Sequence, residues 1–280
     1  MMHEAQLHDE NCFLTLTYND ENIPDFDSLD YTHVQKFMKR LRRTLEGTKY
    51  EKKIKFYRVG EYGDSFGRPH YHLIIFGFDF SCLHIFDRGR QVNKRTRWRG
   101  DDQQPQYRST LLEHLWTHGN AEIANVNYDT CMYVAKYVTK KLLGHDKKYY
   151  KERNIEPERS SMSKGYVKPD TKERLSYPIG HEWLQKYWRD VYPRDYVVIN
   201  GKKIKPPRSY DEWLEKHHPE IYEEVKKNRE DSYKDVDFER LNVEHEVRVR
   251  IHENYKQQLK SSHDWHAINY LKGEMYGESV

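Results

Sequence analysis

The sequence of 280 residues lacks the features that mark several broad classes of protein. Its three cysteines, Cys12, Cys82 and Cys131, are widely spaced without a C-x-x-C pair, so they build neither a disulfide framework nor a zinc knuckle. No apolar run reaches the roughly 18 residues of a membrane-spanning helix, and the N-terminal segment has no basic and apolar regions like those of a signal peptide. We therefore expect a protein with no membrane association that works in a reducing cytoplasm.

Apolar residues are also scarce, and charge is unevenly distributed. Only 36% of the chain is hydrophobic, a figure that includes 23 tyrosines, so we expect a lean core. The net charge is +3, but residues 211–246 carry 13 acidic against 6 basic side chains, which leaves +10 for the rest. Basic residues cluster with aromatic ones in 88–99 and 136–153, a pattern that suits single-stranded nucleic acid. For residues 88–99 alone, a solvated loop is an equal alternative.

Hydrophobic periodicity predicts an α+β fold. The strand-like and helix-like segments alternate in an order that favours a sheet with helices packed on one of its faces. Residues 79–108 have no periodicity and are expected to form an insertion. The predicted strands are 13–18, 54–59, 70–78 and 121–126, and the predicted helices are 30–45, 111–116 and 127–143.

The second half of the chain has a different composition. Residues 154–210 contain six prolines and one short amphipathic helix near Trp183 and Trp188, so this loop-rich stretch is expected to pack on the first domain. The acidic tail is rich in Glu and Lys and predicts exposed helices. We expect three regions: a domain at 1–150, a loop-rich extension at 151–210 and a charged, mainly helical region at 211–280.

A pair of histidines is the first candidate site. His70 and His72 lie two residues apart on a predicted strand, so both imidazoles point to one face and can reach one ion. Glu61 ends the preceding strand, where hairpin pairing would bring its carboxylate alongside, and Asp64 is an alternative third ligand. This set suits Mg²⁺ or Mn²⁺. The competing interpretations are polar surface histidines and a plain turn carboxylate.

A pair of tyrosines is the second candidate site. Tyr133 and Tyr137 are neighbours on a predicted helix, opposite a core stripe that includes Cys131. A phenol oxygen attacks phosphorus when a cation stabilises the phenolate, and Lys136 and Lys140 are near enough to help. Two interfacial tyrosines packed under a lid are the alternative.

Taken together, these motifs resemble the rolling-circle replication initiators of microviruses and gokushoviruses, which belong to the His-hydrophobe-His (HUH) endonuclease superfamily. The resemblance covers about residues 10–145. It implies a central antiparallel sheet of the HUH or RRM-like kind and a nicking and strand-transfer domain at 1–150. The matching motifs are Phe13-Leu14-Thr15-Leu16-Thr17-Tyr18, Gly60-Glu61-Tyr62-Gly63, Arg68-Pro69-His70-Tyr71-His72 and Tyr133-Val134-Ala135-Lys136-Tyr137-Val138-Thr139-Lys140-Lys141.

The resemblance implies a metal-dependent strand transferase that acts on single-stranded or melted origin DNA in the bacterial host cytoplasm. His70, His72 and Glu61 would hold Mg²⁺ or Mn²⁺, and Tyr133 and Tyr137 would be the paired nucleophiles. One tyrosine would form a 5′-phosphotyrosine link and leave a 3′ hydroxyl for a host polymerase, and the strand would later be rejoined. The residues expected to contact DNA are Arg68, Arg95, Arg97, Trp98, Arg99 and Lys141.

Two features limit the resemblance, and two other functions compete with it. Relatives often carry a cysteine-rich stretch before the first strand, and this chain either lacks it or is a fragment. No P-loop motif occurs, so we expect no nucleotide cofactor and a host helicase for unwinding. The rivals are a transposase or relaxase of the same superfamily and a non-catalytic module that binds single-stranded nucleic acid.

Overall fold

The structure is a computed structural model that describes most of the first 233 residues. The described ranges are 1–48, 51, 54–63, 67–81, 95–100, 104–144 and 147–233, with residues 243, 246, 247, 249–251, 253, 254 and 257 beyond them. The side chains of 137–144, 147, 175 and 233 are outside the description.

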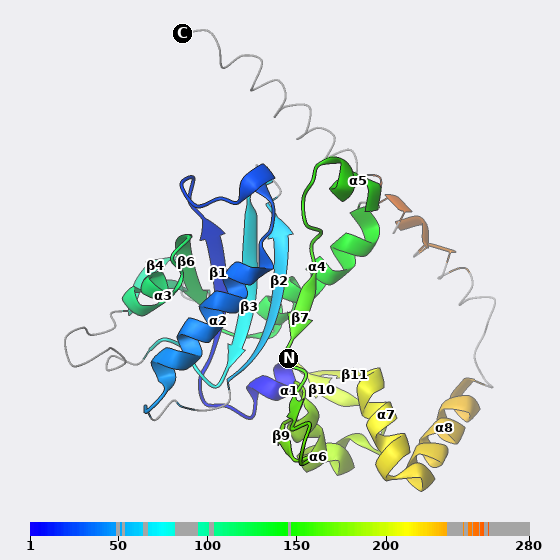
Figure 1. The fold of residues 1–280 in the computed structure, drawn as a ribbon. Helices are drawn as coiled ribbons and strands as arrows, with labels where there is room; N and C mark the ends of the chain where they lie inside the picture. Colours follow the sequence, from blue (N-terminus) through cyan, green and yellow to red (C-terminus); the bar gives the residue numbers. More distant parts are fainter. Residues whose placement is uncertain are drawn as a thin grey trace.

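A seven-stranded antiparallel sheet forms the centre of the molecule (Figure 1). Its strand order is β4-β5-β6-β1-β3-β2-β7, so the α+β fold with a central antiparallel sheet is confirmed. The four predicted strands are β1, β2, β3 and β6. The bounds are β1 Asn11–Tyr18, β2 Lys55–Tyr62, β3 Pro69–Phe76, β4 Arg95–Arg99, β5 Gln106–Ser109, β6 Gly119–Ala124 and β7 Ser160–Met162.

Three strands of this sheet were not expected. The description of 79–108 as an insertion was wrong for its described part, because β4 and β5 pair with each other and β5 pairs with β6. Their sequences lack alternating apolar residues, since the nine residues of the two strands include four arginines and only two aromatic residues. At the opposite edge, β7 comes from the predicted loop-rich extension and pairs with β2.

Helices surround the sheet and continue into the C-terminal part of the chain. The predicted helices correspond to α2, α3 and α4. The bounds are α1 Met2–Ala5, α2 Tyr31–Leu45, α3 Thr110–Leu115, α4 Tyr128–Gly144, α5 Lys147–Glu152, α6 His181–Val191, α7 Arg208–His217 and α8 Pro219–Tyr233, with a 3-10 turn at Asp25–Asp27. Two small hairpins, β8 (Tyr166–Val167) with β9 (Arg174–Ser176) and β10 (Val197–Ile199) with β11 (Lys202–Ile204), lie between α5 and α7. No helix among the described residues has the length and apolar character needed to span a bilayer.

Helices cover both faces of the sheet, so the expectation of one covered face was wrong. Alternation along β1 sends Leu14 and Leu16 into a core shared with α2 and α3, and α2 lies across this face in Figure 1. Phe13 points to the other face, where it packs in a second core with Val134 of α4. Each face therefore has its own apolar layer, and the polar members of β1 share the α4 face with Phe13.

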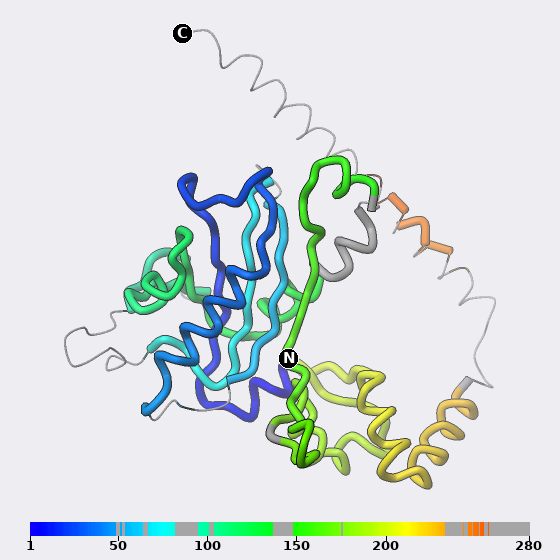
Figure 2. The backbone as a smooth tube through the Cα atoms, viewed as in Figure 1, coloured from blue at the N-terminus to red at the C-terminus, as the bar shows by residue number. Residues whose placement is uncertain are grey.

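The C-terminal lobe, defined here as residues 180–233, has a separate apolar core. Leu184 and Trp188 of α6 pack with Leu214 of α7 and Val225 of α8. The helices beyond residue 210 therefore share one core with α6. Figure 2 shows the start of the chain lying between the sheet and this lobe.

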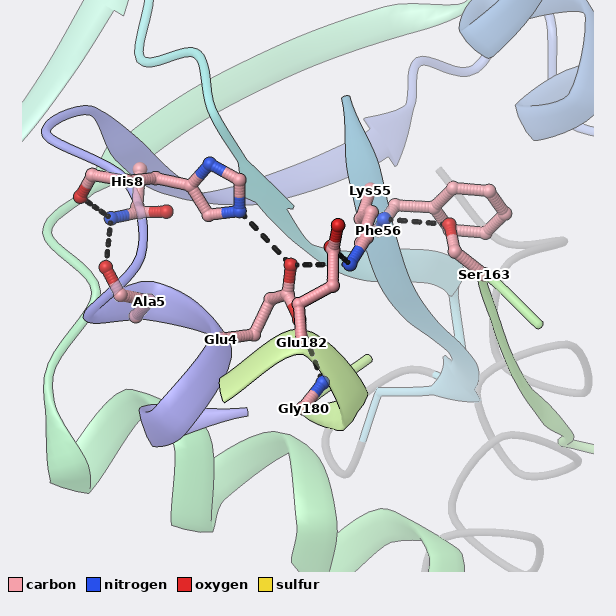
Figure 3. A network of polar contacts seen from close by, with 9 residues as sticks. Glu4, Ala5, His8, Lys55, Phe56, Ser163, Gly180 and Glu182 are labelled. Carbon is pink, nitrogen blue, oxygen red and sulfur yellow. Dashed lines mark hydrogen bonds and ion pairs between the residues drawn. The ribbon is translucent and has the colours of Figure 1, made fainter. Parts of the chain in front are cut away.

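Polar contacts join the N-terminal segment to both the central sheet and the C-terminal lobe. The buried Glu4 carboxylate lies 2.8 Å from Lys55 Nζ of β2 and accepts a 2.7 Å hydrogen bond from the backbone N–H of Gly180 (Figure 3). Lys55 also pairs with Glu182 of α6. Beside them, His3 stacks on Trp183 with ring centroids 3.6 Å apart. The first residues of the chain thus attach the C-terminal lobe to the sheet.

Candidate active site

Strand pairing brings the three predicted metal ligands together. His70 and His72 lie on the same face of β3, as the spacing of two predicted. In the register of β2 with β3, Glu61 is directly opposite His70. Glu61 belongs to the body of β2, which runs on to Tyr62 rather than stopping at residue 59 as predicted. The hairpin pairing thus places the Glu61 carboxylate beside both imidazoles.

The three side chains form a tight, largely buried group. His70 Nε2 lies 2.7 Å from Glu61 Oε1, and His72 Nε2 lies 3.7 Å from the same oxygen. One ligand atom from each residue falls within 4.8 Å of the others. Asp64, the alternative third ligand, lies outside the described residues. Among the residues that the structure describes, this is the group of His, Cys, Asp and Glu whose geometry suits a metal ion.

The second ring nitrogen of each histidine faces a protein oxygen. His70 Nδ1 lies 3.1 Å from the Arg68 carbonyl oxygen, and because a carbonyl accepts only, Nδ1 donates its proton there. His72 Nδ1 lies 3.2 Å from Thr15 Oγ1. Both contacts leave the Nε2 atoms facing Glu61. Such outer hydrogen bonds fix the ring orientation and tautomer of metal-ligating histidines.

The electrostatics of the group also suit a cation. Burial by itself would raise the pKa of Glu61, but the hydrogen bond with His70 and the nearby His72 imidazole outweigh it and lower the pKa of this carboxyl. Burial lowers the pKa of His72, so its imidazole favours the neutral form that can ligate a metal. Within the described part of the chain, no group donates a hydrogen bond to the buried Glu61 Oε2. An anionic oxygen with unused capacity beside two imidazoles fits a divalent cation.

Tyr133 lies over this group. Its ring centroid is 5.1 Å from that of His72, in an edge-to-face arrangement, and the residue is 42% exposed. Cys131, a predicted core residue, and Val134, which was not predicted to be core, are buried and hold α4 on the sheet. Lys136 is exposed on the next turn. The side chains of Tyr137, Lys140 and Lys141, on the same helix, lie outside the described residues.

A pocket of about 510 Å³ opens on the same face of the sheet. One wall carries His70, His72 and Tyr133. The lining continues over Phe13, Thr15 and Thr17 of β1 and Ala124 of β6. The lining residues on β4, β5, β6, the start of α4 and the segments next to them are mostly polar and are called the polar wall: Arg99, Gln104, Gln106, Glu122, Asn125, Asn127, Asp129 and Thr130. Two of the three predicted metal ligands, His70 and His72, and one predicted nucleophile, Tyr133, therefore line a single cavity.

The residues expected to contact DNA do not form one surface. Arg99 lines the pocket. On the same strand, Trp98 is 53% exposed and Arg97 donates to the Gly100 carbonyl oxygen. Arg95 is engaged within the protein, because it lies 3.1 Å from the Asp79 carboxylate and stacks on the Tyr107 ring.

Arg68 has a role close to the metal group. Its guanidinium donates to the Tyr18 carbonyl oxygen and pairs with the exposed Asp20, so it ties the end of β1 to the segment before β3. The Arg68 carbonyl oxygen also orients His70. These contacts place Arg68 at the edge of the candidate site.

The sequence analysis missed the polar residues that face the histidines across the sheet. Thr15 lies opposite His72, and Glu122 lies opposite Thr15 on β6. The alternation of Thr15 and Thr17 with Leu14 and Leu16 was a usable signal, because it marks a polar face on a central strand. Gln106 gave no such signal, since its strand was not predicted.

Similar proteins come from small phages. The replication-associated protein VP4 of Bdellovibrio phage phiMH2K is 35% identical over 230 residues, which cover 79% of this chain and 63% of that protein. ORF4 of Chlamydia phage 1, also a replication-associated protein, is 34% identical over 214 residues, with coverage of 76% and 48%. ORF2 of Spiroplasma virus 4, of the same description, is 29% identical over 241 residues, with coverage of 82% and 66%.

These alignments span about half to two thirds of the length of the relatives. No solved structure matches the chain. Residues 11–142 match the family model described as replication-associated protein ORF2/gene 2 protein, and this range includes Glu61, His70, His72 and Tyr133. The predicted resemblance to phage replication proteins is confirmed: residues 11–142 of the chain are similar to this family of replication-associated proteins.

Proposed function

We propose that this chain is a phage replication initiator that nicks single-stranded or locally melted origin DNA. The observation that carries the proposal is the shared pocket, in which Tyr133 lies over His72 of the Glu61–His70–His72 group. The family match and the relatives named replication-associated proteins support a role in replication. The nicking chemistry is our inference from the site.

Glu61, His70 and His72 would hold a divalent cation, with Mg²⁺ or Mn²⁺ as the proposed ion. When bound, such an ion supplies Lewis-acid polarisation of the phosphate oxygens. The protein would hold its ligands in place through the Arg68 carbonyl oxygen and Thr15 Oγ1, which orient the two imidazoles. This arrangement would fix the scissile phosphate within reach of the phenol.

Tyr133 is one of the two proposed nucleophiles, and either phenol of the pair can make the first cut. The attacking Oη would form a bond to phosphorus as the bond to the 3′ oxygen breaks; the phenol gives up its proton, and the departing oxygen takes one to become a 3′ hydroxyl. Lys136, and Lys140 on the following turn, would favour the phenolate. The product is a 5′-phosphotyrosine link and a primer end for a host polymerase.

Tyr137 is the other proposed nucleophile, one helical turn further along α4. The tyrosine that did not make the first cut would cut the regenerated origin after a round of synthesis, and the free 3′ hydroxyl would then attack the first phosphotyrosine to close the displaced strand. Each step exchanges one phosphodiester for another, so bond energy is retained and no nucleotide cofactor is needed. Strand separation is assigned to a host helicase.

The experiment is a covalent-capture assay. The protein is incubated with a single-stranded origin oligonucleotide and Mn²⁺ or Mg²⁺, then denatured. We expect an adduct with the 5′ end of the downstream fragment, its loss in the double variant Tyr133→Phe/Tyr137→Phe and in His70→Ala/His72→Ala, and its persistence in Tyr166→Phe, which alters an exposed tyrosine of β8. Adduct formation by the double tyrosine variant would refute the nucleophile assignment.

A non-catalytic module that binds single-stranded nucleic acid is the second candidate. It is favoured by the exposed Trp98 ring, over which the Arg108 guanidinium lies at 3.7 Å, because such a pair is a stacking surface for bases. DNA binding without any adduct, on every phage-origin strand tested, would support this candidate over the nicking enzyme.

A further inference from the structure

The polar wall of the pocket has its own chemistry, distinct from that of the histidine wall. The pocket volume of about 510 Å³ lies within the roughly 300–1,000 Å³ typical of small-molecule sites. The polar wall combines one guanidinium, two carboxylates and several carboxamides, contributed by β4, β5, β6 and the start of α4. It is therefore built from four elements and is not a single surface loop.

The charges of this wall disfavour a phosphate. Arg99 Nη2 lies 2.7 Å from Glu122 Oε2, so the positive charge of the guanidinium is matched inside the pocket. Asp129, in the first turn of α4, adds a further carboxylate. A phosphate placed against Glu122 and Asp129 would meet two negative charges at short range. An uncharged group rich in hydrogen-bonding atoms suits this wall better.

The same wall has fixed hydrogen-bonding groups. Arg99 Nε donates to Gln106 Oε1 at 2.6 Å, which sets the orientation of that carboxamide. Asn127 Oδ1 accepts a hydrogen bond from the backbone N–H of Thr130, which fixes the orientation of the Asn127 carboxamide. Carboxamides pair with base edges through one donor and one acceptor, whereas carboxylates only accept and so select amino groups.

The apolar part of the pocket provides a surface for a flat ring. Tyr133 is 42% exposed and stands edge-on to the Phe13 ring with centroids 6.2 Å apart, while Phe13 is buried and stacks on His72. Aromatic side chains of this kind stack with unpaired bases. A planar base can thus contact apolar atoms with its face while its edge meets the polar wall.

From this arrangement we propose that the polar wall is a recognition site for one unpaired nucleobase next to the scissile phosphate, and that it selects a base with an exocyclic amino group. Asp129 accepts from that amino group, and Gln106 pairs with the adjoining edge. Thymine is disfavoured because it has no exocyclic amino group. The inference rests on the proposed nicking function for the location of the scissile phosphate, but the wall itself would bind a base without any chemistry.

The first experiment reads base preference from the cut. A single-stranded pool with randomised positions is incubated with the protein and Mn²⁺, and the captured adducts are sequenced. We expect thymine to be depleted about tenfold at one position flanking the cut. A depletion of this size corresponds to the discrimination that one good base contact provides. Asp129→Ala and Gln106→Ala should each reduce that depletion to about twofold, again judged by the energy of a base contact.

Two matched variants serve as controls. Glu220→Ala removes a carboxylate from the first turn of α8, and Gln185→Ala removes an exposed carboxamide from α6; both lie in the C-terminal lobe. Each should retain the thymine depletion of the unmodified protein. Equal base frequencies at both flanking positions, or a depletion that survives in Asp129→Ala and Gln106→Ala, would overturn the inference.

A second experiment separates this inference from the proposed function. Affinities for short oligo(dC) and oligo(dT) are measured by fluorescence anisotropy in EDTA, where no cutting is expected. We expect tighter binding of oligo(dC) and a smaller ratio of the two affinities in Asp129→Ala. If no adduct forms but this ratio falls, the nicking function fails and the base site stands; if the ratio equals one in the unmodified protein, the base site fails.

Discussion

At the scale of single residues, the candidate site depends on side chains that orient the proposed metal ligands. Thr15 Oγ1 lies 3.2 Å from His72 Nδ1, while His72 Nε2 faces Glu61. With Nε2 directed at a cation, Nδ1 carries the proton and donates it to the Thr15 hydroxyl. Thr15 is therefore a positioning residue for His72.

Replacing Thr15 by valine tests this role, because valine preserves the shape and β-branching but removes the hydroxyl. We expect Thr15→Val to weaken Mn²⁺ binding about tenfold, the lower end of the effects of such outer partners. Thr15→Ser keeps the hydroxyl and should retain the affinity. Titration calorimetry measures both, and equal Mn²⁺ affinity in Thr15→Val and the unmodified protein would refute the assignment.

At the scale of elements, successive residues of β2 face opposite sides of the sheet. Gly60 faces the helix α2, and its neighbour Glu61 faces the histidines. A Cβ atom at position 60 would lie 2.9 Å from Tyr31 Oη and 3.0 Å from Leu29 Cδ2. Tyr31 cannot move freely, because its hydroxyl donates to the Pro157 carbonyl oxygen and accepts from the backbone N–H of Arg159. Gly60 thus lets α2 pack closely behind the residue that carries the carboxylate.

Gly60→Ala should therefore destabilise the protein by about 1–3 kcal/mol, the usual cost of inserting an atom into a packed site. Gly63→Ala is the matched control, since a Cβ there meets its nearest atom at 3.5 Å, an ordinary contact. Urea denaturation measures both free energies of unfolding. A loss in Gly60→Ala no larger than that in Gly63→Ala would show that α2 adapts without cost.

At the scale of the whole molecule, the N-terminal segment joins the sheet to the C-terminal lobe through a buried carboxylate. Burial by itself would raise the pKa of Glu4, but hydrogen bonds from His8, Lys55 and the Gly180 backbone outweigh it and lower the pKa to about 2 (Figure 3). Its ordinary value is 4.5. The ionised carboxylate is thus bound more strongly in the folded state than the protonated one.

Glu4→Gln should lower the free energy of unfolding at neutral pH by about 3 kcal/mol, because it removes one partner from a buried ion pair. Glu212→Gln, which alters an exposed pair with Arg208, should change it by less than about 1 kcal/mol. Denaturation curves at pH 7 compare the two. Equal small losses would mean that the Glu4 contacts add no net stability.

Denaturation curves of Glu4→Gln and of the unmodified protein, measured at several pH values, give a second test. The folded-state pKa of Glu4 lies below the unfolded one, so the unfolded chain binds more protons as pH falls from about 4.5 towards 2, and stability falls over that range. The contribution of the ionised Glu4 carboxylate to the free energy of unfolding is fully present above about pH 4.5. Glu4→Gln should therefore show a shallower decline of stability below pH 4.5 than the unmodified protein.

Much of the fold could be predicted from local patterns. The helix α2 follows from apolar residues at helical spacing after Asp30, whose side chain accepts from the Thr32 backbone N–H as an N-cap. The shared face of His70 and His72 could also be predicted, because the alternation of side chains along a strand depends only on local backbone geometry. The strands β4, β5 and β7 were missed because β4 and β5 together contain four arginines and few apolar residues, and β7 has only three residues.

The sequence by itself determined which residues are candidates for the chemistry, since the spacing of His70 and His72 and of Tyr133 and Tyr137 depends only on backbone geometry within one element. The tertiary structure decided what these residues meet. Register between strands set Glu61 opposite His70, packing of α4 on the second face set Tyr133 over His72, and the β4–β5 hairpin closed the pocket with Arg99. These contacts join distant segments, and their choice depends on the packing of both sheet faces at once, which no local pattern specifies.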